Sequence, residues 1–294
     1  MTIGHGFNRI ILTTSVCLCI GMSIGRAAPQ IHYASPMGDE NWRVNGTQLR
    51  CGLALTIPNY GIGYFEQYAT KKPHFILRKW DQVERTLPAQ VIAAPPVWKP
   101  GQRQSYAVSR VYIKPGEFGL FLDREPTLKL LTFLSQGYQI NVNYMSEQGF
   151  GTSVSLSPIH FRKVYSAYQK CVGNLLTFEY ADVKESVFHF GIDGRTLSDA
   201  DKNQLRRIAK YVEVDAQIDK IEVIGYADES GRKGYNNAIS EYRAKAVKNY
   251  LLWLGVPQSK LNVTWVGAKF PVGRNDTEDG RAANRRVTIT LIKK

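Results

Sequence analysis

Residues 224–246 read IGYADESGRKGYNNAISEYRAKA, and this stretch decides how the C-terminal part of the chain folds. An apolar run ends at Ile224, and a polar segment that contains glycine follows. From Asn237 to Leu254 apolar residues recur at the spacing of one helix face. The stretch therefore predicts the end of a strand, a loop and then a helix.

Arg243 falls on the apolar side of this predicted helix. It stands four residues after Ile239 and four before Val247, and residues that far apart share a helix face. A buried guanidinium needs an acid or an anion beside it, because an unpaired buried charge is costly. Asp228, just past the end of the strand, can supply the acid. The two side chains either pair with each other or together bind a ligand that carries an ammonium and a carboxylate.

Strands and helices alternate around this stretch, from Glu185 to the end of the chain. Strands are expected at 186–190, 221–226, 261–267 and 287–292, helices at 198–214 and 237–254, and a helical turn at 278–283. Such an alternation predicts an α/β sandwich, in which helices pack on a sheet. Ligands of open α/β sheets bind beyond the strand ends, which is where Asp228 is expected.

Several residues of this region share a wider pattern with a known family. They are Gly225, Asp228, Gly231, Tyr235-Asn236, Ile239-Ser240, Arg243-Ala244 and Asn284 to Val287. Over residues 185–294 the chain resembles the OmpA C-terminal-like peptidoglycan-binding family. The resemblance implies that Asp228 and Arg243 bind the free amino-acid end of diaminopimelate in peptidoglycan. It also places Asn236, Phe190, Gly191, Asn284 and Arg285 around that site.

One position departs from the family pattern. The family often has Phe-Asp at the end of its first strand, and this chain has Phe190-Gly191. An acidic contact is therefore missing there, although backbone contacts from this edge can remain. For Asn284 and Arg285 two roles stay open, framing the pocket or holding the structure together.

The preceding part, residues 28–172, is rich in β-patterned runs. They lie at 48–57, 74–80, 105–113, 118–122, 128–134 and 138–144, with Gly- and Pro-containing turns between them. This predicts an antiparallel β-rich domain, sandwich-like or barrel-like. A membrane barrel is disfavoured, because several runs are shorter than the ~9–11 residues that such strands need. A helix is expected from Ser157 to Cys171, and residues 173–184 are expected to form a connector, with a further strand possible at 175–180.

Residues 1–27 are predicted to be a cleaved secretory signal peptide. Ile10–Ile24 is a fifteen-residue apolar run followed by small residues, whereas a membrane span needs ~20 apolar residues. An uncleaved anchor is the alternative. After cleavage only Cys51 and Cys171 remain, and such a pair in an exported chain predicts one disulfide rather than two free thiols.

Other classes of function are not expected. The net charge is +13, but the basic residues are scattered, and export argues against nucleic acid as a partner. No His lies within the motif and Asp228 is expected beside an arginine, so no nucleophile–base pair is present and we expect no enzyme. No CxxC motif or Cys/His cluster indicates a metal site, and no cofactor is expected.

The order of the parts carries a second resemblance. An export signal, a soluble β-rich domain and a wall-binding domain resemble the layout of the T-ring proteins of the sodium-driven flagellar motor. This implies a periplasmic, ring-forming adaptor whose N-terminal domain docks on the flagellar basal body and on a partner such as MotX. Its C-terminal domain would then fasten the ring to peptidoglycan and support the stator proteins. The alternative is an envelope protein of the same wall-binding family without a flagellar role.

Overall fold

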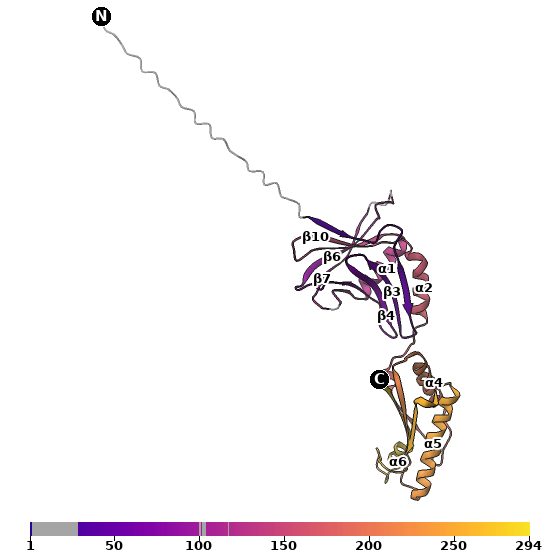
Figure 1. The fold of residues 1–294 in the computed structure, drawn as a ribbon. Coiled ribbons are helices and arrows are strands. Elements are labelled where there is room, and N and C mark those ends of the chain that lie inside the picture. Colours follow the sequence, from indigo (N-terminus) through magenta and orange to yellow (C-terminus); the bar gives the residue numbers. More distant parts are fainter. Residues whose placement is uncertain (2–28, 100, 102–103, 117) are drawn as a thin grey trace.

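The computed structural model describes residues 1, 29–99, 101, 104–116 and 118–294. The described chain folds into two halves (Figure 1). Each half has its own hydrophobic core. Nearly all of the predicted signal peptide lies outside the described residues. Within the described ranges no helix is both long and apolar enough to cross a membrane. The predicted fold class, a β-rich half followed by an α/β half, is confirmed.

One ten-stranded sheet makes up the N-terminal half. Its strands are β1 (Gln30–Tyr33), β2 (Trp42–Gly46), β3 (Arg50–Ile57), β4 (Gly61–Tyr68), β5 (His74–Lys79), β6 (Leu87–Ala94), β7 (Tyr106–Ile113), β8 (Leu120–Leu122), β9 (Gln139–Met145) and β10 (Gly151–Leu156). Their order across the sheet is β1-β10-β9-β6-β7-β8-β5-β4-β3-β2. Only the β1–β10 pair is parallel among these strands, so the predicted antiparallel character holds.

The sheet curves around its own core. The hydroxyl of Tyr144 on β9 lies 3.5 Å from that of Tyr60, in the turn between β3 and β4. Likewise a Cβ placed on Gly63 of β4 would lie 3.0 Å from the side chain of Leu156 on β10. Strands far apart in the sheet order therefore face each other (Figure 1). The apolar side chains between them form one core.

The strand expected at 128–134 was a wrong prediction, because these residues belong to helix α1 (Arg124–Gln136). Thr127, Leu130, Leu131 and Leu134 are its buried residues, and their spacing of three and four residues matches one helix face. Gly137 ends the helix with a positive φ of 90°, a conformation that glycine adopts without strain.

The helix expected to begin at Ser157 begins later, as α2 (Phe161–Gly173). The Ser157 hydroxyl instead donates a hydrogen bond of 2.9 Å to the buried carboxylate of Glu40, which holds the segment before the helix in place. Residues 175–180 form no strand, and the next element is the short helix α3 (Ala181–Lys184).

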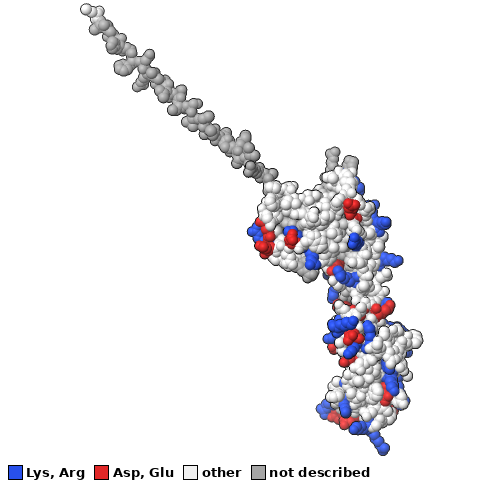
Figure 2. Space-filling view, viewed as in Figure 1, with Lys and Arg blue, Asp and Glu red and all other residues white. Residues whose placement is uncertain are grey.

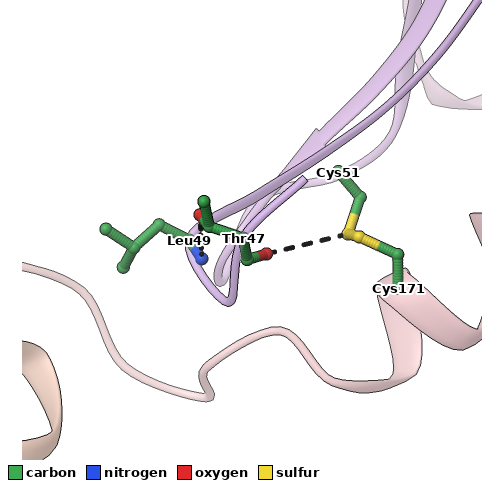
Figure 3. Close-up of a disulfide and its surroundings, with 4 residues drawn as sticks. All are labelled: Thr47, Leu49, Cys51 and Cys171. Carbon is green, nitrogen blue, oxygen red and sulfur yellow. Dashed lines mark hydrogen bonds between the residues drawn. A yellow bond between two sulfur atoms is a disulfide. The ribbon is translucent and has the colours of Figure 1, made fainter. Parts of the chain in front are cut away.

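The predicted disulfide is confirmed. Cys51 on β3 is bonded to Cys171 near the end of α2, with a Cα–Cα distance of 5.9 Å (Figure 3). Gly46, opposite Cys51 on β2, allows this approach, because a Cβ there would lie 2.5 Å from the Cys171 sulfur. The bond thus ties α2 to the β2–β3 turn.

The C-terminal half is a four-stranded sheet with helices packed on it. Its elements are β11 (Glu185–His189), α4 (Asp199–Val214), β12 (Ile218–Gly225), α5 (Lys233–Trp253), the 3-10 turn η1 (Gln258–Lys260), β13 (Leu261–Trp265), α6 (Glu278–Asn284) and β14 (Arg286–Lys293). The sheet order is β11-β14-β12-β13. As expected, Ser198 caps α4, and its side chain exchanges hydrogen bonds with Asp201.

The two halves meet at a short joint. The backbone N–H of Leu176 donates to the carbonyl of Gln48 at 2.8 Å, and Lys71 pairs with Glu179 at 2.8 Å. Leu49 points away from the disulfide (Figure 3) and packs against the core of the C-terminal half. The carboxyl end of β12 and helix α6 lie at the opposite end of this half, away from the joint (Figure 1).

Candidate ligand-binding site

A cavity of about 390 Å³ opens at this far end, where β12 stops and α5 begins. Four of the predicted site residues line it: Asp228, Asn236, Arg243 and Arg285. The structure therefore brings together side chains from three separate stretches of the chain. The rest of the lining consists of Ile192, Asp193, Ala227, Ser230, Gly231, Tyr235, Ile239, Glu278 and Arg281.

Arg243 is buried, as its helical register predicts, with a relative exposure of 1%. Its guanidinium donates hydrogen bonds to three backbone carbonyls: from Nε to Gly194 at 2.9 Å, from Nη2 to Gly191 at 3.0 Å and from Nη1 to Tyr226 at 3.4 Å. A guanidinium has five N–H groups, so two are left over from these three bonds, and Arg243 lines the cavity.

The surroundings of Arg243 prepare its guanidinium to bind an anion. Burial lowers its pKa, and the nearby carboxylate of Asp228 acts in the opposite direction. The Phe190 ring lies 5.5 Å from the guanidinium carbon and covers one side of it. A carboxylate that entered the cavity would meet a cation already stripped of water and fixed in direction, which favours strong binding.

Asp228 pairs with Arg285 and not with Arg243. Nη1 of Arg285 lies 2.9 Å from Oδ2 of Asp228, and its Nη2 lies 2.7 Å from Oε1 of Glu278. The expectation that Asp228 supplies the ion-pair partner of Arg243 was therefore wrong, because β14 places a second arginine between the acids. The alternative in which the two motif residues simply pair with each other is excluded by the same contact.

The ion pair keeps Asp228 charged. Burial by itself would raise its pKa, but hydrogen bonds from Arg285 and from the backbone N–H of Ser230 outweigh burial, so the pKa lies below its ordinary value. The pKa of Arg285 is raised in turn, because the bonds to Asp228 and Glu278 outweigh the lowering caused by burial. Oxygen lone pairs of Asp228 that Arg285 leaves free can still accept from an ammonium group.

Comparison with known proteins places this domain in a family. Residues 189–285 match the OmpA family, and residues 33–177 match the MotY N-terminal domain. The peptidoglycan-associated lipoprotein of Pseudomonas aeruginosa is 33% identical over 125 residues, which are 42% of this chain and 73% of that protein.

The chain belongs to the OmpA family.

Its N-terminal half is a MotY N-terminal domain, so the chain joins two known domains. The sodium-type flagellar protein MotY of Vibrio parahaemolyticus is 28% identical over 289 residues, which cover 97% of this chain and 98% of that protein. Among solved structures, the peptidoglycan-associated lipoprotein from Burkholderia pseudomallei is 29% identical, with a TM-score of 0.35, and the match covers 36% of this chain and 89% of that one.

Three other predicted residues form hydrogen bonds that fix the segments around the cavity. The carbonyl of Phe190 accepts from Nε of Arg285 at 3.3 Å, and the carbonyl of Gly191 accepts from Arg243, so this edge contributes backbone groups. The Asn236 side chain donates to the carbonyl of Gly231 at 2.9 Å and fixes the loop before α5.

Asn284 has a structural role and does not frame the pocket. It is buried and does not line the cavity. Its carbonyl oxygen accepts from the backbone N–H of Val272 at 2.7 Å and of Gly273 at 3.0 Å. Asn284 therefore holds the loop that precedes α6, while Arg285 beside it reaches the cavity.

Five charged or polar lining residues were not among the predicted site residues: Asp193, Ser230, Tyr235, Glu278 and Arg281. The Tyr235 hydroxyl donates a hydrogen bond to the Asp193 carboxylate across the cavity rim. Tyr235 belongs to the OmpA-family motif, so its position was visible. Asp193 stands two residues after Gly191 and thus supplies an acid on the edge where this chain lacks the Asp of the family pattern. Within the described part of the chain, no cluster of His, Cys, Asp or Glu is placed to hold a metal ion.

Proposed function

We propose that this chain is a non-catalytic periplasmic adaptor of a flagellar motor that binds peptidoglycan through the cavity of its C-terminal domain. One observation carries the proposal: the same cavity is lined by a buried arginine with free N–H groups and by a charged aspartate. Relatives whose names include peptidoglycan binding or association match the same domain, which supports this reading.

The ligand that suits this cavity is the free end of a diaminopimelate side chain. That end carries an ammonium and a carboxylate on one carbon atom. Arg243 would bind the carboxylate, and the oxygens of Asp228 would accept from the ammonium. A lysine-type stem peptide ends in an ammonium alone, so it would leave the N–H groups of Arg243 without an anion and should bind more weakly.

Pull-down with insoluble peptidoglycan tests this assignment. We expect the mature chain to sediment with diaminopimelate-type peptidoglycan and less with the lysine type. The substitution Asp228→Asn preserves side-chain shape, removes the charge and should weaken sedimentation roughly tenfold. Asp219→Asn is the matched control, because Asp219 is exposed at the other end of β12, the strand that Asp228 follows. If Asp228→Asn sedimented as well as the control and the wild type, this site would be ruled out.

For the N-terminal domain we propose docking on the flagellar basal body and on a MotX-like partner, as part of a ring that positions the stators. The similarity to MotY along nearly the whole chain supports this role over that of an envelope protein without a flagellar role. We take residues 28–172 as the docking domain, 173–184 as the connector and 185–294 as the wall-binding domain. Co-purification of the mature chain with isolated basal bodies tests the docking, and its absence from them would favour the envelope protein.

The geometry suits an adaptor. The wall-binding cavity lies at the end of the C-terminal half that faces away from the joint, so the N-terminal domain does not cover it (Figure 1). Each domain can therefore reach its own partner from one chain.

A further inference from the structure

A second cavity, of about 270 Å³, lies in the N-terminal domain and has no part in wall binding. It is formed where the β6–β7 connection, the end of α1 and the start of α2 meet. Leu134 and Pro96 are buried and form an apolar floor, and the exposed Trp98 stands at the rim. The full lining is Pro96, Trp98, Lys99, Leu134, Gly137, Pro158, Ile159, His160, Arg162 and Lys163.

The charged groups around this cavity are all basic. Lys99, Arg162 and Lys163 line it together with His160, and no Asp or Glu is found among the described lining residues. Within the described ranges Lys99 and Lys163 form no ion pair, so their charges are available to a ligand. Figure 2 shows Lys and Arg on the side of the domain where α2 lies.

The basic groups approach the cavity from two sides. Lys99 lies across the end of α1, so close that a Cβ on Gly137 would be 2.7 Å from its Nζ. Arg162 and Lys163 stand on the opposite wall, in the first turn of α2, where Nε of Arg162 donates to the carbonyl of Ser135. A bound segment would therefore have positive charge on both flanks and apolar surface beneath it.

We propose that this cavity, called here the basic pocket, binds an acidic peptide segment of a partner protein, with one bulky apolar side chain on the apolar floor and flanking carboxylates on Lys99, Arg162 and Lys163. Charge complementarity selects acidic residues on the two flanks of the peptide, and the apolar floor selects an apolar residue at its centre. An anionic membrane is the weaker reading, because a headgroup layer suits a flat basic face, whereas here the charges surround a concave apolar hollow.

The basic pocket and the wall-binding cavity lie in different domains, each away from the joint. Helix α2 has 13 residues and is therefore about 20 Å long. Its C-terminal end is tied to the joint through Cys171, so the basic pocket at its N-terminal end lies well away from the joint. A partner at the basic pocket would leave the other cavity accessible, and failure of one site does not imply failure of the other.

Fluorescence polarisation on the intact mature chain tests the proposal. The probe is a labelled nine-residue peptide with Leu-Phe at its centre and Asp or Glu at every other position. We expect saturable binding that weakens with added salt, and a loss of roughly tenfold in affinity for the double variant Lys99→Glu/Lys163→Glu. A peptide with Gly-Gly at its centre should bind at least severalfold more weakly than the probe.

The matched control is Lys72→Glu/Lys220→Glu, which changes the net charge equally at two exposed lysines outside the basic pocket. It should keep affinity within about twofold, since long-range attraction is screened at physiological salt. Equal loss in both variants, or no binding of the probe by the wild type, would overturn the proposal. So would binding to phosphatidylglycerol vesicles without binding to the peptide. Peptidoglycan sedimentation of the Lys99→Glu/Lys163→Glu variant should remain normal, which separates this test from that of the wall-binding site.

Discussion

Replacing Arg243 by alanine should destabilise the C-terminal domain itself in addition to weakening ligand binding. The guanidinium holds the loop after β11 and the end of β12 together, through hydrogen bonds to Gly191, Gly194 and Tyr226. Alanine would remove the donors, and of the three carbonyls that of Gly191 would keep a hydrogen bond of 3.0 Å from the backbone N–H of Gly194. A loss of wall binding in this variant would therefore have two causes.

The size of the effect follows from the hydrogen-bond distances. The bonds to Gly194 and Gly191 are 2.9 and 3.0 Å long, whereas the bond to Tyr226 is 3.4 Å and contributes little. A hydrogen bond from a charged group contributes about 1.5–3 kcal/mol. Taking about 1.5 kcal/mol for each of the two shorter bonds, because Gly191 is reachable by water, gives a loss of about 3 kcal/mol.

Hydrogen exchange measured by mass spectrometry on peptides from β12 and α5 would report this change in the free energy of unfolding. Arg206→Ala, on the exposed face of α4, is the matched control and should change it by less than about 0.5 kcal/mol. A loss below about 1 kcal/mol for Arg243→Ala would refute the reasoning that this side chain anchors the loops. The whole effect on wall binding would then belong to ligand contact.

Two further perturbations have defined outcomes. The double variant Cys51→Ser/Cys171→Ser removes a disulfide between residues 120 positions apart. The free energy of unfolding of the N-terminal domain, measured in urea, should fall by up to about 5 kcal/mol. An equal fall for the C-terminal domain would contradict this. The pKa of Asp228 is lowered below 3.8, so stabilisation by its carboxylate is complete above that pH and disappears as pH falls through the folded pKa. The stability difference between the wild type and Asp228→Asn should thus be constant from pH 7 to about pH 4 and shrink below it; a difference that fades near pH 6 would be inconsistent with this pairing.

Much of the C-terminal domain can be predicted from the sequence, because its signals are local. The Ser198 cap, the apolar face of α5 and the alternation of strands and helices are each contained in short stretches. The burial of Arg243 follows from its spacing to Ile239 and Val247 for the same reason.

The N-terminal sheet is harder to predict, because several of its strands lack the β-branched and aromatic runs that mark a strand. β4 and β6 were both missed: β4 carries two glycines and the polar pair Glu66-Gln67, and β6 includes a proline and small alanines. Helix α1 was taken for a strand, since its short apolar run lies among strands and its helical spacing was not recognised. Pairings such as β9 with β6 join residues about fifty positions apart, which no local pattern specifies.

By itself, the sequence determined the two-domain order, the disulfide pair, and the placing of Asp228 after a strand and Arg243 on the inner face of a helix. Only the tertiary structure decided which groups meet. Arg285 reaches Asp228 because β14 pairs with β12, and Arg243 turns to the carbonyls of the loop after β11. The basic pocket likewise exists only where Lys99 and α2 come together. Such contacts depend on strand register and packing between distant segments, and these are set by the folded chain as a whole.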